Sequence, residues 1–100
     1  MRLSIIIVNW NTSKLLETCL ESIYRNPPAF NFEVVVVDNA SSDFNPKEMA
    51  EKFKQTVFIV NSENLGYAEG NNQAIKAVSG DYVLLLNPDT EVKNDALTVL

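Results

Sequence analysis

Four short apolar runs, each followed at once by asparagine or aspartate, limit the fold of this sequence more than any other feature. The runs and the polar residues that follow them are residues 3–8 with Asn9, 33–37 with Asp38, 56–60 with Asn61 and 82–86 with Asn87. Valine- and isoleucine-rich runs of this length, without polar alternation, are typical of strands buried on both faces of a parallel sheet. We therefore expect four parallel strands whose carboxyl ends carry polar side chains.

Amphipathic segments between these runs predict the helices. Leucine and isoleucine recur at helical spacing up to Tyr24, and Thr12 or Asn11 can cap this first helix. A second helix is expected over about 46–54 and a third over about 68–78.

Two further expectations concern the ends of helices. Gly80 is a suitable C-terminal cap for the third helix, and a last helix is expected to begin near Asn94 or Asp95. Alternation of strands and helices predicts an α/β fold, with a mostly parallel sheet and helices on both faces.

Composition excludes several classes of function. The chain has 100 residues, of which 46% are hydrophobic, enough for one core, and its net charge of -5 argues against binding nucleic acid. The absence of histidine excludes imidazole bases and histidine metal ligands in this segment. The single cysteine, Cys19, is interpreted as a core residue. It fits a reducing compartment. Residues 3–8 are too short for a membrane span and lack the small-residue cleavage site of a signal peptide, so we expect a cytoplasmic location.

The polar residues at the strand ends are the candidate site. Ligands of open parallel sheets bind outside the carboxyl ends of the strands. Such residues also cap helices and form turns, but Asp38 and Asp89 together favour function. Asp89, in the Asn87-Pro88-Asp89 turn, is a candidate ligand for Mg²⁺ or Mn²⁺, which prefer carboxylate and phosphate oxygens. The alternative for Asp89 is an N-cap or Asx turn ahead of Thr90.

The loop and helix start over residues 64–72 form the most distinctive stretch. Gly66 permits a positive φ or a close backbone approach, directly before a helix. Gly70 lies inside that helix, for which close packing and a ligand contact are equally good reasons. For Trp10 the alternatives are stacking on a base and packing, and its place at a strand end favours packing.

Four motifs, in the same order along the chain, resemble family 2 glycosyltransferases with the GT-A fold, which has a Rossmann-like nucleotide-binding half. The motifs are Ile7-Val8-Asn9-Trp10-Asn11, Val37-Asp38-Asn39-Ala40-Ser41-Ser42-Asp43, Asn64-Leu65-Gly66-Tyr67-Ala68-Glu69-Gly70-Asn71-Asn72 and Gly80-Asp81-Tyr82-Val83-Leu84-Leu85-Leu86-Asn87-Pro88-Asp89. The resemblance is strongest to the rhamnosyltransferase-like branch and covers nearly the whole chain.

The resemblance implies a set of residues that bind the nucleotide, with Asp89 as the metal ligand. These are Asn9, Trp10, Asn11, Asp38, Asn39, Gly66, Asn71 and Asn87. Asp38 would accept a hydrogen bond from the imide N–H of uracil or thymine. Asn87 departs from the commonest Asp-x-Asp pattern, since an amide carries no charge. Asp81 precedes the fourth strand and is placed away from the site.

The resemblance also implies an activity. We expect metal-assisted, inverting transfer of a sugar from a UDP- or dTDP-sugar donor to a saccharide or lipid-linked acceptor, in cell-wall or polysaccharide synthesis. Residues 1–100 would be the donor-binding part, truncated at its C-terminal end. This part would be inactive alone, because in inverting members of the family the catalytic base lies further along the chain. Membrane association, at the inner face, would depend on missing regions, and the apolar fourth strand would favour dimers.

Three other readings stand beside this one. A phosphorylated receiver-like domain needs an acidic pair after the first strand, where this chain has Asn9-Trp10-Asn11. A dinucleotide-binding oxidoreductase needs a Gly-x-Gly-x-x-Gly segment there, which is absent. A catalytically silent binding module of the same fold satisfies the sequence equally well, and metal-dependent nucleotide binding would separate the enzyme from the other readings.

Overall fold

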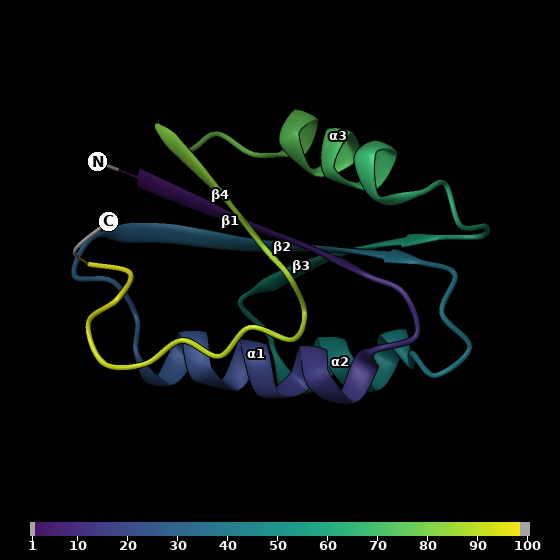
Figure 1. Ribbon diagram of the computed structural model, residues 1–100, viewed down its shortest axis with the longest axis horizontal. Helices are drawn as coiled ribbons and strands as arrows, with labels where there is room; N and C mark the ends of the chain where they lie inside the picture. The colour runs from purple at the N-terminus through teal and green to yellow at the C-terminus, as the bar shows by residue number, and fades with distance from the viewer. Residues whose placement is uncertain (1, 99–100) are drawn as a thin grey trace.

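A four-stranded parallel sheet forms the centre of the computed structural model, which describes residues 2–98 (Figure 1). Its strands are β1 (Arg2–Asn9), β2 (Asn31–Asn39), β3 (Thr56–Asn61) and β4 (Tyr82–Leu86), and they lie in the order β3-β2-β1-β4. The predicted parallel sheet is confirmed. The asparagine or aspartate after each of the first three apolar runs belongs to the strand itself, so those polar side chains are part of the sheet.

Helices cover both faces of the sheet, as predicted. Helices α1 (Ser13–Arg25) and α2 (Pro46–Lys52) lie on one face, and α3 (Tyr67–Ala77) lies on the other (Figure 1). The chain runs from β1 to β2 to β3 in one direction and then returns to the far side of β1 to form β4. This reversal of strand order creates a switch point between β1 and β4, where open α/β sheets bind ligands.

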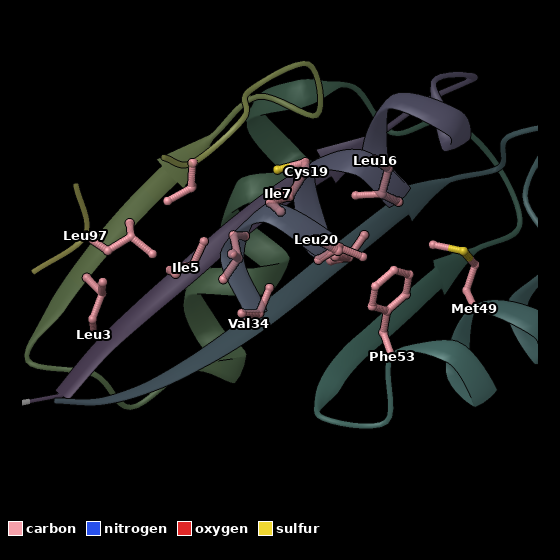
Figure 2. Packing of buried hydrophobic residues seen from close by; sticks show 13 residues of the cluster. Leu3, Ile5, Ile7, Leu16, Cys19, Leu20, Val34, Met49, Phe53 and Leu97 are labelled. Carbon is pink, nitrogen blue, oxygen red and sulfur yellow. The ribbon is translucent and has the colours of Figure 1, made fainter. Parts of the chain in front are cut away.

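Two apolar layers explain why the strands show no polar alternation. Ile5, Ile7 and Val34 face α1 and meet Leu16 and Leu20, as Figure 2 shows. The intervening side chains face α3, in a second cluster made up of Ile6, Val8, Val35, Val37 and Ala74. Because both faces of β1 and β2 are covered, the central positions 5–8 and 34–37 are all apolar.

The single cysteine lies in the first of these clusters, as predicted. Cys19 is fully buried on α1 (Figure 2). Burial, with a smaller contribution from the charge of Asp89, raises the pKa of its thiol to about 11. Cys19 is therefore a protonated core residue at neutral pH.

The predicted last helix is wrong over residues 94–98, which form turns. Asn94 has a φ of 55°, and the N–H of Thr98 bonds to the carbonyl of Asp95, three residues back. Val92 and Leu97 are buried beneath the sheet beside α1. Apolar anchoring of this segment to the core therefore takes the place of a continuous helix, and residues 99–100 of the prediction lie outside the described part.

The segment before these turns is fastened to α1 by hydrogen bonds on both sides of Val92. The Val92 N–H donates to Ser22 Oγ over 2.8 Å, and Asn26 Nδ2 donates to the Val92 carbonyl over 3.0 Å. The backbone N–H and carbonyl of Val92 are thereby both satisfied, by a side chain of α1 and by that of its C-cap residue.

Gly80 does not cap α3, which ends at Ala77 with Val78 as its C-cap. A Cβ atom at Gly80 would collide with Ser4 Oγ, which accepts a 2.9 Å hydrogen bond from the Gly80 N–H. The predicted reason for this glycine is therefore wrong: it allows the chain to pass close to β1 before β4 begins.

A polar cluster at the amino ends of the strands, which we call the amino-edge latch, surrounds this contact. Glu33 accepts hydrogen bonds from Ser4 Oγ (2.6 Å), the Ser79 N–H (3.1 Å) and Arg2 Nε (3.5 Å). Asp81 accepts from the Arg2 N–H over 2.9 Å, so it lies at the amino edge.

None of the helices within residues 2–98 is long and apolar enough to span a membrane.

Candidate functional site

At the carboxyl edge of the sheet, Asn9 ties the end of β1 to the end of β2. Its side chain is fully buried, and Nδ2 donates to Asp38 Oδ1 over 2.9 Å and to Ser13 Oγ over 3.2 Å. Its Oδ1 accepts from Thr12 Oγ1 over 2.7 Å. The amide of Asn9 is thus used inside the protein, where it fixes the shape of the turn that follows β1.

The turns after β1 and β2 are joined a second time through Asn11. Asn11 has a φ of 53°, a left-handed conformation that asparagine tolerates. Its N–H donates to Ser41 Oγ over 2.8 Å, and its side-chain oxygen accepts from the Ser42 N–H over 2.8 Å. The two turns therefore form one rigid unit.

The N-terminus of α1 is capped from this neighbouring turn. Thr12 is the N-cap residue, but its side chain makes no capping bond and contacts Asn9 instead. Asp43 accepts from the Ser13 N–H over 3.1 Å and from Ser13 Oγ over 2.7 Å. The prediction is correct for the N-cap position, which Thr12 occupies, and wrong for the capping bond, which Asp43 supplies from 30 positions beyond Ser13.

Asp38 lies inside this unit. It is only 1% exposed. Its Oδ1 accepts from Asn9 and from Ser41 Oγ (2.7 Å), and its Oδ2 accepts from the Ser41 N–H (3.0 Å). The carboxylate is thus nearly closed to solvent, and its hydrogen bonds hold the two turns together.

Trp10 points away from the core at the same edge. It is 55% exposed, so the interpretation of Trp10 as a packing residue is wrong. β1 ends at the buried Asn9, and Trp10 lies in the bend beyond the covered part of the strand. An exposed indole beside the switch point can stack on a planar or apolar ligand group.

The loop before α3 is the second part of the edge. Gly66 is the N-cap residue of α3, with φ 89° and ψ 165°, a conformation open almost only to glycine. A Cβ atom on Gly70 would lie 3.0 Å from Val8 Cγ1 and 3.3 Å from Asn39 Nδ2. Close packing of α3 on the sheet therefore accounts for Gly70, one of the two predicted alternatives.

Asn71 follows on the same helix and is only 7% exposed. Within residues 2–98, no hydrogen bond to its side chain is formed, whereas the buried amides of Asn9 and Asn39 are fully engaged. No buried side-chain nitrogen or oxygen atom among the described residues lacks a hydrogen-bond partner, so the free amide atoms of Asn71 are open to solvent at this edge. Asn71 is therefore well suited to contact a bound ligand.

The Asn87-Pro88-Asp89 turn follows β4 directly. Leu86 pairs with Ile7, so this turn lies beside the end of β1 at the switch point. Asn87 and Asp89 are exposed, and the Thr90 N–H donates to the Asn87 carbonyl over 3.0 Å. No helix begins here in the described chain, so the N-cap alternative for Asp89 is wrong.

This turn offers few protein ligands for a metal ion. Across residues 2–98 there is no group of three or more Asp, Glu, Cys or His side chains able to hold a metal ion. Asp89 and the Asn87 amide fit a site in which a bound diphosphate and water supply the other ligands, since Mg²⁺ is commonly held by one or two carboxylates plus substrate phosphates.

The structure thus gathers the predicted residues into two hydrogen-bonded groups and one exposed turn. Three residues that sequence reasoning missed hold these groups together with Asn61, one of the polar residues at the strand ends: Ser41, Asp43 and Gln73. The segment from Ala40 to Asp43 carried a usable signal, because it sits directly after Asp38 in the second motif. The pairing of Asn61 with Gln73 had no local signal.

This chain belongs to glycosyl transferase family 2, whose profile matches residues 4–100. It is 32% identical over 101 residues to a teichoic acid poly(glycerol phosphate) polymerase of Staphylococcus epidermidis, covering 97% of this chain and 14% of that protein. It is 29% identical over 102 residues to the glycosyltransferase GlyG of Streptococcus pneumoniae, covering 98% and 33%. The chain spans between 14% and 33% of the length of such curated relatives.

Solved structures agree with the fold. Staphylococcus aureus TarS 1–349 in complex with UDP superposes with a TM-score of 0.83 and 28% identity, over 97% of this chain and 30% of that one. The mannosyltransferase PcManGT of Pyrobaculum calidifontis, in complex with GDP-Man and Mn²⁺, gives a TM-score of 0.82 and 29% identity, over 94% and 29%. The α/β fold of this chain is therefore that of GT-A enzymes.

Proposed function

We propose that these residues form the donor-binding part of a family 2 glycosyltransferase, with a UDP- or dTDP-sugar held at the carboxyl edge between β1 and β4. The observation that carries the proposal is the placement of the exposed Trp10 and Asp89 on the two turns that flank the switch point. The complexes of TarS with UDP and with UDP-GlcNAc, and of PcManGT with GDP-Man, support a nucleotide-sugar ligand.

The proposed roles follow from exposure. Trp10 stacks on the donor, Asn71 and the backbone around Gly66 hydrogen-bond to it, and Asn11 shapes the turn beneath it. Asp38 is buried among protein partners, so we assign it to positioning this turn in place of reading the imide edge of the base. The rhamnosyltransferase-like branch stays a prediction from the four motifs.

A divalent ion, Mg²⁺ or Mn²⁺, would be held by Asp89 with support from Asn87. When bound, the ion would neutralise charge on the leaving diphosphate. The Mn²⁺ in the PcManGT complex supports this choice. Asp89 would be the main anionic protein ligand, and Pro88 would stiffen the turn that carries it.

Transfer itself needs a base within hydrogen-bond reach of the acceptor hydroxyl. At the carboxyl edge, Asp38 and Asp43 are engaged in the turns, and Asp89 is assigned to the metal. Glu63 and Glu69 are exposed near the loop, but their motif gives them no catalytic role. We therefore propose that these 100 residues bind the donor without transferring it, and that an inverting base and a saccharide or lipid-linked acceptor site belong to a longer protein.

Calorimetric titration of the chain with UDP-, dTDP- and GDP-sugars, each with and without Mn²⁺, tests the donor assignment. We expect binding of a uridine or thymidine diphosphate sugar that strengthens when Mn²⁺ is present. Absence of binding to all three classes, by a chain shown to be folded by circular dichroism, would overturn the proposed function.

The metal assignment is tested by Asp89→Asn, which is nearly isosteric. We expect the Mn²⁺-dependent part of nucleotide binding to disappear while the unfolding curve stays unchanged. The matched control is Asp95→Asn, an exposed aspartate with the same change in charge. An Asp89→Asn variant that keeps the full Mn²⁺ dependence would show that Asp89 is not the ligand.

A further inference from the structure

A chain of side-chain amides runs from the end of β2, across the end of β3, to α3. Asn61 and Gln73 exchange two hydrogen bonds, from Asn61 Nδ2 to Gln73 Oε1 (2.8 Å) and from Gln73 Nε2 to Asn61 Oδ1 (3.0 Å). Asn61 Nδ2 also donates to Asn39 Oδ1 over 2.9 Å. Asn39 Nδ2 then donates to the Gly66 carbonyl over 3.0 Å. The amide chain therefore contacts α3 at both its first carbonyl and its second turn.

The Gly66 carbonyl, at one end of this amide chain, determines which group of each amide donates and which accepts. The Gly66 carbonyl can only accept, so Asn39 must present its NH₂ group to it and its oxygen to Asn61. Asn61 must then donate to Asn39, which leaves its oxygen to accept from Gln73. Every member needs both a donor and an acceptor, so a carboxylate cannot replace Asn39 without setting an acceptor against the Gly66 carbonyl.

The amide chain holds a backbone that would not keep its shape alone. Gly66 lies at φ 89° and ψ 165°, its N–H bonds to Asn64 Oδ1 (2.8 Å), and its carbonyl accepts from both Asn39 and the Gly70 N–H. Sparsely populated conformations of this kind persist only when the surrounding structure over-determines them. Asn39 is 1% exposed, so its side chain acts on the loop and not on a ligand.

The position of Asn71 depends on the same chain. Asn71 lies between Gly66 and Gln73, the two points at which the amide chain contacts α3. Fixing the helix at both points sets where the Asn71 amide stands relative to the edge of the sheet. Ordering these groups before a ligand arrives reduces the entropy that binding must overcome.

We propose that Asn39, Asn61 and Gln73 are positioning residues that pre-organise the loop over residues 64–67 and the first turns of α3 for a nucleoside diphosphate sugar. This inference rests on the proposed function and deepens it. The three residues touch no ligand themselves, and they act through Gly66 and Asn71.

Two variants test the inference at opposite ends of the amide chain. Asn39→Asp reverses the polarity of the group facing Gly66. Gln73→Ala removes the outer, half-buried member without placing a charge in the interior, so it remains informative even where Asn39→Asp fails to fold. Gln55→Glu, an exposed change of the same charge at the opposite edge, is the control for Asn39→Asp.

Amide hydrogen exchange and UDP titration with Mn²⁺ are measured on each folded variant. We expect exchange of residues 64–71 to quicken by about tenfold and the Kd for UDP to rise by about tenfold, while exchange in β1 and β2 stays as in the wild type. The control should match the wild type in both measurements.

Unchanged exchange over residues 64–71 in Gln73→Ala would overturn the inference, as would faster exchange that leaves the Kd of a UDP-binding wild type unaltered. A rise in Kd that results from global unfolding would also contradict the inference. In that case exchange in β1 and β2 would quicken as much as exchange over residues 64–71. If the wild type binds no nucleotide, the proposed function fails, and the exchange measurement alone decides whether the amide chain holds the loop.

Discussion

Asp38 shows how a residue predicted from sequence to contact a ligand can also hold the fold together. Its place after a buried strand indicated a ligand contact. In the structure, Asn9 and Ser41 surround its carboxylate. A residue that accepts hydrogen bonds from two different turns contributes to folding before it contributes to binding.

This assignment predicts that Asp38→Ala lowers the free energy of unfolding by about 1–3 kcal/mol, because buried donors on Asn9 and Ser41 lose their acceptor. Urea unfolding at neutral pH measures the change, and Asp95→Ala, at an exposed position, should stay close to the wild type. An Asp38→Ala variant of unchanged stability that binds UDP more weakly would return Asp38 to the role of base reader.

At the level of strands, the hydrogen bonds of the amino-edge latch fasten the residues before β4 to the first residues of β1 and to β2. Burial raises the pKa of Glu33, but hydrogen bonds from Ser4, the Ser79 backbone and Arg2, together with the Arg2 charge, outweigh it and hold the pKa below its ordinary value of 4.5. The ionised form is thus favoured in the folded state. Its contribution is complete above that ordinary value and is lost as the pH falls through the lowered pKa.

Glu33→Gln should therefore destabilise the protein by about 1 kcal/mol at pH 7, where the charged acceptor is lost. The difference from the wild type should shrink toward zero at acidic pH, as the pH falls through the lowered pKa of Glu33. Urea unfolding at the two pH values, with the exposed Glu51→Gln as a control, measures this difference. A difference of equal size at both pH values would contradict the assignment.

Elements were more predictable than the contacts between them. The strands, the helices over 13–25 and 67–77, and Pro46 at the start of α2 follow from apolar periodicity and local backbone preferences. The turns over 94–98 do not follow from these local signals, because the burial of Val92 and Leu97 determines the path of the backbone there. The Asp43 cap and the Asn61–Gln73 pair join residues distant in sequence, which periodicity cannot reveal.

For the molecule as a whole, β4 is an edge strand with apolar side chains open to solvent. It pairs with β1 on one side, and Val83 and Leu85 are 43% and 46% exposed on the face that carries α3. Apolar edge strands of this kind promote association between chains.

We expect the 100-residue chain to self-associate as its concentration rises. Leu85→Lys should raise the concentration at which association begins by at least about tenfold, since burying a leucine contributes about 1.5–3 kcal/mol. Light scattering after size-exclusion chromatography measures the mass of each species. A wild-type chain that stays monomeric at every concentration at which it remains in solution would contradict this expectation.

The central claim is that a nucleoside diphosphate and a divalent ion bind together at the carboxyl edge, and paramagnetic broadening by Mn²⁺ in an NMR spectrum tests it most directly. The two ends of β1 lie about 25 Å apart, far enough for the ion to distinguish them. With UDP present, we predict that Mn²⁺ broadens the amide signals of residues 87–89 and 9–11 and leaves residues 2–4 and 31–33 sharp, and that the effect weakens when UDP is omitted. Broadening centred on the amino edge, or broadening that UDP does not change, would contradict the account.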